Sequence, residues 1–372
     1  MSRVKFGDVV KDVKINIDRL NNPYEYYVAG DHMDSEDLTI HRKGCFTTDD
    51  VGPAFIRVFK PGQILYGSRR TYLKKIAVAD FEGVCANTTF VFETKDPHAF
   101  EQRLLPFIML SKDFTTWSIA KSKGSTNPYV LFSDLADFEF ELPPLEEQKV
   151  LVDKLWAAYR LKEAYKKLLV ATDEMVKSQF IEIFYGMETT PVKDYIDDSF
   201  PGEWGTEDKD GNGVKVIRTT NFTNSGKLNL ADVVTRSIED RKVVRKQIKK
   251  YDTILERSGG TADNPVGRVV LFEEDNLFLC NNFTQVLRFK DVDPRFAFYA
   301  LYYFYQTNRT AIRSMGSKTT GIQNLNMSKY LEIGIPNASD EDQKAFVTIA
   351  EQADKSKSVI QKALVYLNDI QS

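Results

Sequence analysis

Two stretches of this chain read alike: LPPLEEQKVLV at residues 142–152 and IPNASDEDQKAFV at residues 335–347. Each follows a run with strand character and opens a long, charged segment that contains no proline. Gln148 and Gln343 hold the same place in the two stretches and lie roughly 190 residues apart. A period this long does not indicate a solenoid of short repeats. It predicts two large domains, each followed by one long helix.

Further matches occur at a similar interval along the whole chain. The pairs are PGQILYGSRR (61–70) with YDTILERSGG (251–260), VCANTTFVF (84–92) with LCNNFTQVL (279–287), and KGSTNPY (123–129) with GSKTTGIQN (316–324). Chance explains one short match, but it does not explain several in the same order. The sequence therefore indicates a tandem duplication.

The two halves combine strand and helix signals without regular βα alternation, which favours an α+β fold. Strands are expected at 54–59, 63–66, 76–79, 88–93, 214–218, 251–256, 267–272 and 277–280. Helices are expected at 97–113 and, as its counterpart, at 295–306. The second of these, RFAFYALYYFYQ, resembles a base-stacking platform, but we interpret it as a buried core helix.

Residues 145–184 contain neither proline nor glycine and predict one helix of roughly 60 Å, at ~1.5 Å per residue. Such a helix needs another long helix as a partner, and the C-terminal segment offers an apolar stripe at three- and four-residue spacing. The alternative is that the C-terminal helix lies only on its own domain. The expected seam residues are Leu155, Leu161, Leu168, Ile349, Ile360 and Leu367.

The composition, 42% hydrophobic and 28% charged, is that of an ordinary globular protein. The three cysteines form no CxxC pair and the three histidines show no ligand spacing, so no disulfide framework or metal site is expected. The N-terminus has no apolar signal-peptide core, and no run of 18 apolar residues occurs. We therefore expect a cytoplasmic protein that does not contact membranes.

The net charge of −3 argues against a protein that binds nucleic acid through its overall charge. Basic residues are nevertheless concentrated at 69–75 (RRTYLKK) and at 241–250 (RKVVRKQIKK). The second run could contact phosphates, or it could be the exposed face of an ordinary helix.

Catalytic motifs are not found in the sequence. No P-loop occurs, and neither NNPY (21–24) nor TNPY (126–129) has the second proline of the loop that holds a target amino group in amino-methyltransferases. No nuclease motif or nucleophilic triad can be defended, and Glu273 to Asp275 read as a hairpin turn. We expect no catalytic residue, no cofactor and no metal.

The strings LPPLEEQ (142–148), GSRRTYLKKIAVADFEGVC (67–85), EWGTEDKDGNGVKVIRTTNF (203–222) and RSGGTADNPVGRVV (257–270) carry a family resemblance. Over essentially its whole length the chain resembles the specificity subunit of a Type I restriction–modification system. IPNASDEDQ departs from the usual LPP opening, so the two halves are imperfect copies.

The resemblance implies two tandem-duplicated target-recognition domains of small twisted sheets with helices. Two long helices would join them as an antiparallel coiled coil with pseudo-two-fold symmetry. The expected boundaries are 1–143 for the first domain, 144–185 for the first helix, 186–336 for the second domain and 337–372 for the second helix. The subunit would read a bipartite site in double-stranded DNA. It would dock two adenine methyltransferase subunits and the restriction/translocase subunits.

DNA contacts are expected from loops at strand ends, where arginine and amide side chains reach bases and lysine and hydroxyl groups hold phosphates. In the first domain these are Arg69, Arg70, Tyr72, Lys74, Lys121, Lys123, Ser125, Thr126 and Asn127. In the second they are Arg218, Thr219, Thr220, Asn221, Arg257, Ser258, Gly259, Gly260, Lys318, Thr319, Thr320, Gln323 and Asn324.

Two other functions remain open at this stage. One is an enzyme of related origin, a fused methyltransferase–nuclease whose motifs are hidden. The other is a scaffold or inhibitor that is built on the same duplicated plan and does not bind DNA.

Overall fold

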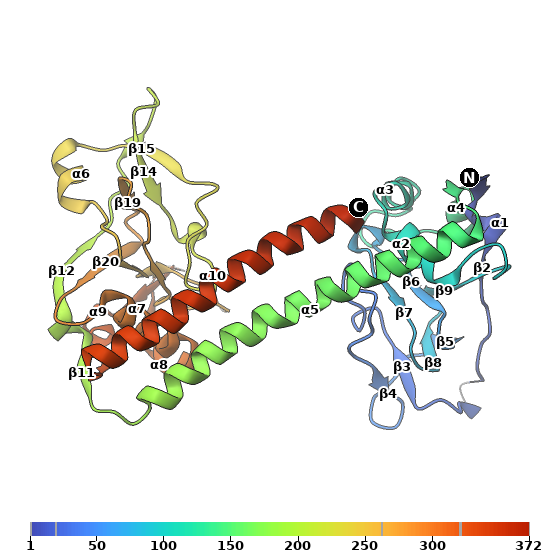
Figure 1. The fold of residues 1–372 in the computed structure, drawn as a ribbon, viewed down its shortest axis with the longest axis horizontal. Coiled ribbons are helices and arrows are strands. Elements are labelled where there is room, and N and C mark those ends of the chain that lie inside the picture. Colours follow the sequence, from blue (N-terminus) through green and yellow to red (C-terminus); the bar gives the residue numbers. More distant parts are fainter. Residues whose placement is uncertain (1, 19–20, 262, 320–321, 372) are drawn as a thin grey trace. The chain divides into compact units, whose positions relative to one another are not determined.

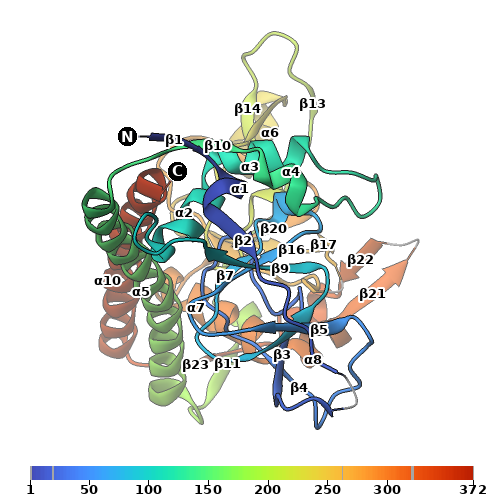
Figure 2. The ribbon, with the colours of Figure 1, turned by 90° about the vertical axis from the view of Figure 1, so that its right-hand side faces the viewer.

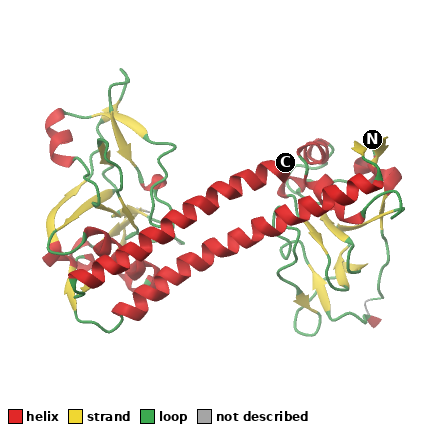
Figure 3. Ribbon diagram, in the orientation of Figure 1, coloured by secondary structure: helices red, strands yellow, loops and turns green. Residues whose placement is uncertain are grey.

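The fold comes from a computed structural model that describes residues 2–18, 21–261, 263–319 and 322–371. The chain divides into two compact units, each of which is described by itself. Unit 1 comprises Met1–Leu168 and Val359–Ser372, and unit 2 comprises Leu169–Ser358 (Figure 1). Both units are α+β, as predicted, with short strands beside long helices (Figure 3).

Each unit contains an antiparallel four-stranded sheet with the same strand order, which confirms the duplication. In unit 1 the order is β2 (Val10–Asp12), β9 (Thr89–Thr94), β6 (Ile64–Gly67) and β7 (Ile76–Val78). In unit 2 it is β12 (Ile196–Pro201), β20 (Thr284–Phe289), β16 (Thr253–Glu256) and β18 (Val269–Leu271).

A second sheet in each unit is built around one parallel pair of strands. In unit 1 the order is β4 (Gly44–Cys45), β3 (Tyr26–Val28), β8 (Gly83–Ala86) and β5 (Phe55–Phe59). In unit 2 it is β13 (Thr206–Glu207), β15 (Val234–Ser237), β14 (Val214–Ile217) and β19 (Phe278–Cys280). The parallel pairs are β3 with β8 and β14 with β19, so Cys85 and Cys280 occupy equivalent positions.

Both of these cysteines are buried, and burial raises the pKa of each thiol to about 12. Cys45 is partly exposed, and hydrogen bonding with Thr47 lowers the pKa of its thiol. The three thiols therefore differ in exposure and in pKa.

A third, two-stranded sheet in each unit sets its first strand beside the strand that precedes its long helix. The pairs are β1 (Ser2–Lys5) with β10 (Glu139–Leu142), and β11 (Thr189–Pro191) with β23 (Gly334–Pro336). Unit 2 also has the small sheet β17 (Ser258–Gly259), β22 (Ile322–Leu325) and β21 (Gly316–Thr319), which is visible in Figure 2. At the equivalent place unit 1 has the bridges Arg69↔Tyr129 and Lys123↔Tyr129.

Short helices complete the units. Those of unit 1 are α1 (Phe6–Val9), η2 (Thr71–Leu73), η3 (Gln102–Leu104), α2 (Leu105–Leu110), α3 (Lys112–Ala120) and α4 (Phe132–Ala136). Those of unit 2 are η4 (Val192–Tyr195), η5 (Thr219–Asn221), α6 (Asp240–Lys246), α7 (Pro294–Thr307), α8 (Arg309–Met315) and α9 (Met327–Tyr330).

The single helix predicted at 97–113 is wrong. The helical segment begins at Gln102 and breaks at Ser111, whose side chain accepts a hydrogen bond from the Phe114 amide at 3.2 Å and caps α3. The predicted hairpin turn at Glu273 to Asp275 is also wrong, because β18 and β19, on either side of it, belong to different sheets.

The long helices are α5 (Leu145–Phe184), which agrees with the predicted bounds, and α10 (Asp340–Gln371). Each is fastened near its start by a buried glutamine side chain. The Gln148 Oε1 atom accepts from the Glu101 amide at 2.8 Å, and its amide group donates to the carbonyls of Ala99 and Pro143. Gln343 repeats this arrangement with the Asp293 amide at 2.9 Å and the Ala338 carbonyl.

Within unit 2 the end of α5 and the start of α10 pack against each other. The Phe346 ring lies 5.1 Å from the Phe180 ring and 5.7 Å from the Phe184 ring, centroid to centroid. Further along α10, Lys357 forms a 2.6 Å ion pair with Asp173, which precedes the two phenylalanines in α5. Residue numbers increase along α10 in the direction in which they decrease along α5, so the pair is antiparallel, as predicted.

The six predicted seam residues differ in burial. Ile360 and Leu367 are buried, and Leu155 and Ile349 are half-buried. The prediction is wrong for Leu161 and Leu168, which are 44% and 48% exposed. The buried residues of α5 include Val152, Tyr159, Val176, Phe180 and Phe184, none of which was predicted for the seam.

The aromatic helix α7 lies in the core of unit 2. Its Phe296, Phe298 and Tyr303 are buried in one cluster with Phe180 of α5 and Phe346 of α10. A base-stacking role for this helix is therefore excluded, and its interpretation as a core helix is confirmed. The first half of α10 thus packs on its own unit as well as on α5.

Candidate nucleic-acid interface

In unit 1 the structure brings together two loops that were predicted as DNA contacts. The first follows β6 and carries Arg69 and Arg70, and the second lies between α3 and α4. Arg70 has φ 51° and donates its amide to the Pro128 carbonyl at 2.7 Å. The Val130 amide donates to the Ser68 carbonyl at 3.0 Å, so the two loops pair through their backbones.

The exposed side chains at this pairing combine cations with aromatic rings. The Arg69 guanidinium lies 5.8 Å from the centroid of the Tyr129 ring, and Tyr129 is 38% exposed. Tyr72, one turn further on, is 53% exposed. Ser125, Thr126 and Asn127 are exposed at the tip of the second loop. An arginine held on an aromatic ring loses little freedom when it meets a base edge.

Three of the predicted lysines in unit 1 already have partners. Lys74 forms a 2.6 Å ion pair with Glu36, and Lys123 forms one of 2.9 Å with Asp134. Lys121 lies 4.8 Å from the centroid of the Trp117 ring. Arg69 and Arg70, both exposed, remain the better candidates for base contacts.

In unit 2 the equivalent place is formed by the loop after β16 and the β21–β22 hairpin. Gly259 and Gly260 have φ of 110° and 66°, and a side chain at Gly260 would meet the Val266 amide nitrogen at 2.8 Å. The Ser258 hydroxyl is 2.7 Å from Asn324 Oδ1, and Gly259 pairs with Gln323 in the ladder. The loop is therefore held against the hairpin.

Arg268 connects this loop to the other predicted segment of unit 2. Its Nε atom pairs with the buried Glu256 carboxylate at 2.7 Å, and its Nη2 atom donates to the Thr219 carbonyl at 3.3 Å. Glu256 also accepts from the Gly260 amide at 3.4 Å. The structure thus places Thr219 and Gly260 around one buried ion pair.

Several predicted side chains are not available to a ligand. Asn221 is buried and donates to the carbonyls of Asn229 and Asp232, so its prediction as a DNA contact is wrong. Ser258 is also buried, and Arg218 forms a 3.0 Å ion pair with Asp232. Thr220 is exposed, and Gln323 is partly buried. Thr320 and the side chains of Lys318 and Thr319 lie outside the described residues.

The basic run 241–250 forms helix α6 and the turn after it. Lys242 and Lys246 pair with Glu203, Arg245 pairs with Asp198 at 2.9 Å, and Lys250 pairs with Asp275 at 2.9 Å. Ion pairing within unit 2 therefore favours the interpretation of this run as the outer face of an ordinary helix.

Sequence reasoning missed Tyr129 and Arg268. Tyr129 was visible only as the aromatic residue that ends KGSTNPY. Arg268 had no local signal, because its partners Glu256 and Thr219 come from other elements.

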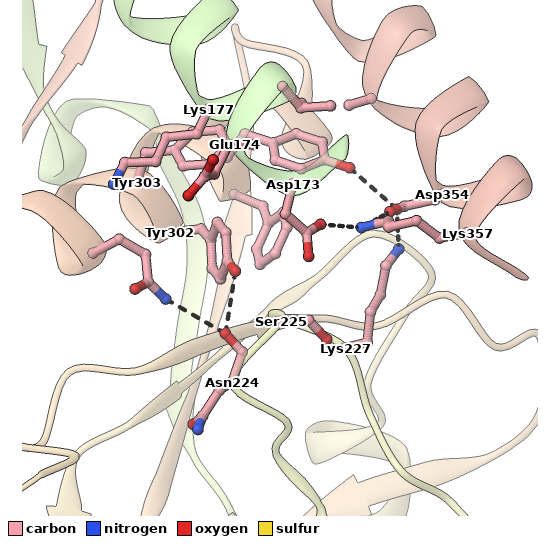
Figure 4. A pocket seen from close by; sticks show the side chains of 15 residues that line it. Asp173, Glu174, Lys177, Asn224, Ser225, Lys227, Tyr302, Tyr303, Asp354 and Lys357 are labelled. Atoms are coloured by element: carbon pink, nitrogen blue, oxygen red, sulfur yellow. Dashed lines mark hydrogen bonds and ion pairs between the residues drawn. The ribbon is translucent and has the colours of Figure 1, made fainter. Parts of the chain in front are cut away.

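In each unit one side-chain contact, here called the tether, holds the loop after the first parallel strand on a long helix. In unit 1 the Tyr159 hydroxyl donates to Asp37 at 2.6 Å, and Asp37 also bonds the Thr39 amide and His41. In unit 2 the Lys227 ammonium lies 2.8 Å from Asp354 (Figure 4). It also lies 2.7 Å from Glu273. Tyr159 follows Gln148 at the same distance along the helix as Asp354 follows Gln343.

The unit 1 tether also gathers possible metal ligands, which the sequence did not indicate. Asp37, His41 and Glu163 each offer a ligand atom within 4.8 Å of the others. Burial opposes the ionisation of Asp37, but its bonds with Tyr159, Thr39 and His41 outweigh that effect and lower the pKa of the carboxyl. These contacts give the cluster a structural role in holding the loop on α5.

Two equivalent loop clusters, with cationic, amide and hydroxyl groups on a duplicated α+β frame, define a class of two-site recognition protein. The model of the family described as Type I restriction modification DNA specificity domain matches residues 19–169 and 199–365. The chain belongs to this family.

The EcoDI specificity subunit of a Type I restriction enzyme from Escherichia coli is 25% identical to this chain over 194 residues. The match covers 50% of this chain and 42% of that protein, so the chain matches less than half the length of this relative.

Two solved structures share the fold. The S subunit of a Type-I restriction-modification system from M. genitalium has a TM-score of 0.62 at 13% identity, over 100% of this chain and 93% of that one. A chain from a type I R-M system, solved in work on its assembly and conformational transition, has a TM-score of 0.57 at 18% identity. That match covers 100% of this chain and 95% of the other.

In the described part of the chain, no helix has the length and apolar character needed to cross a membrane.

Proposed function

We propose that this chain is the DNA-recognition subunit of a Type I restriction–modification system and that each unit reads one half of a bipartite site. The observation that carries the proposal is the pair of equivalent loop clusters, Arg69 to Tyr129 in unit 1 and Arg257 to Asn324 in unit 2. Such loops offer arginine and amide groups for base edges and hydroxyl and backbone groups for phosphates. Family membership supports the same role.

Arg69 and Arg70 are the proposed base-reading residues of unit 1, with Tyr72, Ser125, Thr126 and Asn127 around them. Arg257, Thr220 and Gln323 are their proposed counterparts in unit 2. Arg257 donates to Gln285 at 3.3 Å, which holds its guanidinium beside the loop. Lys121, Lys318 and Thr319 are assigned to phosphates, as are the backbone groups of Gly259 and Gly260.

The proposed domain boundaries are those drawn from the sequence: recognition domains at 1–143 and 186–336, and long helices at 144–185 and 337–372. The chain would supply no catalysis, because it carries no methyltransferase or nuclease motif. Two adenine methyltransferase subunits and the restriction/translocase subunits would perform the chemistry, in the cytoplasm.

The exposed apolar stripe on α5 supports the docking of a methyltransferase subunit. Ala157, Leu161, Ala164 and Leu168 alternate at four- and three-residue spacing, and all four are exposed. Exposed leucines at this period form the seam of a helix pair when a second amphipathic helix covers them. The two leucines that were wrongly expected between α5 and α10 would then face a partner subunit.

The test is methylome sequencing of a host that carries the methyltransferase subunit with or without this chain. A bipartite adenine-methylation motif should appear only when the chain is present. The double substitution of Arg69→Ala and Arg70→Ala should weaken the discrimination between bases in one half-site. The loss should be ~1–3 kcal/mol for each bidentate contact that is removed. Arg257→Ala should affect the other half alone, so each unit is the control for its counterpart. Methylation by the purified chain alone would overturn the proposal.

A further inference from the structure

The one-turn helix η2 of unit 1 carries an exposed tyrosine beside the two arginines that are proposed to read bases. Tyr72 is the middle residue of η2, and its side chain is 53% exposed. Among the residues that the structure describes, this side chain has no hydrogen-bond partner and no ring packed against it. The preceding residue, Thr71, is buried, and its hydroxyl lies 3.3 Å from the Ser122 hydroxyl after α3. The turn is thus fixed on the unit, and the tyrosine ring is available to a ligand.

Both ends of this turn have a backbone conformation that residues with side chains rarely adopt. Arg70, which precedes η2, has φ 51°, and Lys74, which follows it, has φ 46°. Left-handed residues other than glycine are strained and persist only where the surrounding structure holds them. Such residues cluster at sites that bind ligands. Strain on both sides of Tyr72 therefore points to a function for the turn.

Unit 2 shows that the fold does not need an arginine at the first of these strained positions. In the duplicated sequence Arg70 corresponds to Gly260, which has φ 66°. Unit 2 therefore fills the same left-handed position with glycine, which adopts it without strain. Two residues further on, the sequence has Ala262 where unit 1 has Tyr72. The combination of a strained arginine and an aromatic residue thus belongs to unit 1 alone.

Contacts from a separate loop hold the far end of the turn. The Glu36 amide donates to the Lys74 carbonyl at 3.1 Å, and the Glu36 carboxylate pairs with the Lys74 ammonium at 2.6 Å. The next residue, Asp37, is bonded by the Tyr159 hydroxyl of α5. The turn that carries Tyr72 is therefore connected to the long helix through two neighbouring residues. A side chain on such a rigid support loses little freedom when it binds.

Other exposed apolar side chains of unit 1 gather around the same loops. Among the described residues of unit 1 outside the long helices, five large apolar side chains are exposed. One is Ile15, and the other four lie in η2, near the end of α3 or in the loop between α3 and α4: Tyr72, Ile119, Tyr129 and Leu131. Phosphate contacts need no apolar rings, whereas the flat faces of bases stack on them.

We propose that Tyr72 is a stacking wedge, a ring that enters the base stack of the half-site read by unit 1 and packs on an unstacked base. Aromatic rings stack on every kind of base, and apolar side chains separate base steps in many proteins that bind DNA. Arg69 and Arg70 would read base edges beside the opened step. The half-site read by unit 2 would have no equivalent wedge, since Ala262 has no ring. This inference rests on the proposed DNA-recognition function.

The test uses the full chain, assembled with its methyltransferase subunits, and a duplex that contains the methylated motif. Pyrrolocytosine, which brightens on unstacking, replaces each cytosine in turn, and permanganate oxidation reports unstacked thymines, so every base pair except that of the methylated adenine is monitored. Binding of the unaltered chain should unstack one step in one half-site only. Tyr72→Phe should retain this signal, and Tyr72→Ala should abolish it. Tyr72→Ala should also lower DNA affinity about fivefold or more, because it removes a base–aromatic stack.

Ile15→Ala is the matched control, because Ile15 is another exposed apolar residue of unit 1 and lies in a loop without proposed DNA contacts. It should change neither the unstacking signal nor the affinity. If Tyr72→Phe loses as much affinity as Tyr72→Ala, the hydroxyl group and not the ring makes the contact, and the wedge is overturned. If Tyr72→Ala keeps the unstacking signal but assembles less methyltransferase subunit by native mass spectrometry, the ring binds a protein and the wedge is again overturned.

Two further outcomes separate this inference from the proposed function. Unchanged unstacking and affinity in Tyr72→Ala, with the motif still recognised, overturn the wedge and leave the proposed function intact. If the unaltered assembly recognises no motif, the proposed function is overturned and the wedge with it.

Discussion

The two units fasten their long helices with equivalent glutamines but surround them differently. Three residues after Gln343, Phe346 is fully buried between Phe180 and Phe184. Three residues after Gln148, Leu151 is 40% exposed. Both copies thus retain the hydrogen bonds that fix the first turn, whereas the apolar packing depends on the neighbouring elements. Similar sequences at two places therefore predict the same local structure but not the same stability.

The largest expected effect comes from removing the aromatic contact of unit 2. Phe346→Ala should destabilise unit 2 by about 3–5 kcal/mol, because it leaves a cavity among four aromatic rings. Leu151→Ala at the equivalent place should cost less than about 1 kcal/mol, since its side chain is already partly in water. Hydrogen exchange followed by mass spectrometry resolves the two units. Equal losses would show that the two packing environments are not different.

The next effect tests what the units share. Gln148→Ala should destabilise unit 1 by about 2–3 kcal/mol, because it leaves the Glu101 amide and two carbonyls without their partner. Gln343→Ala removes one bond fewer and should cost slightly less. Urea unfolding of each variant measures this order. A neutral result at either position would remove the glutamine as a determinant of the first helical turn.

A smaller contrast is expected between the two tethers. Lys227→Met should cost about 2 kcal/mol, less than a fully buried ion pair, because Asp354 keeps Lys357 and Glu273 is partly exposed. Tyr159→Phe should cost about 1–2 kcal/mol, since the buried Leu38 amide loses its acceptor while Asp37 keeps its bonds with Thr39 and His41. Thermal unfolding provides both values. If Tyr159→Phe proves the more damaging, the hydroxyl bond and not the ion pair is the stronger tether.

The smallest effect is a shared response to acid. Lys227 and Lys357 outweigh the burial of Asp354 and lower the pKa of its carboxyl, and the carboxyl of Asp37 also has a lowered pKa. A lowered pKa in the folded state gives stability that is present above the unfolded value of ~3.9 and is lost as the pH falls through the folded value. Asp37→Asn and Asp354→Asn should each flatten the loss of stability below about pH 4. If the loss of stability below about pH 4 is the same in both variants as in the unaltered chain, other carboxyls dominate that loss.

Much of the architecture was readable from the sequence because it depends on local signals. The absence of proline and glycine gave the bounds of α5, and repeated strings gave the duplication. The buried face of α5 was not readable, because Ala157, Leu161, Ala164 and Leu168 form an apolar stripe as regular as a buried one. The face that packs on unit 1 includes Tyr159, whose hydroxyl is used by Asp37, and polar residues next to it.

The sequence predicted which segments form the candidate interface, but not which of their side chains are buried or paired. Short loops after strands identified Arg69 and Arg257, since such loops commonly carry binding residues. The burial of Asn221 and the Arg268–Glu256 pair depend on residues far apart in the chain. Local patterns contain no information about such pairings.

The equivalent burial of Cys85 and Cys280 gives each unit its own chemical reporter. Only a thiolate reacts rapidly with alkylating reagents, and a buried thiol with a raised pKa must first become exposed. Cys45, which is partly exposed and has a lowered pKa, should be modified first in the native chain. After it is blocked, alkylation of Cys85 would time the opening of unit 1 and alkylation of Cys280 that of unit 2. One labelling time course on the unmutated chain would then give two separate opening rates.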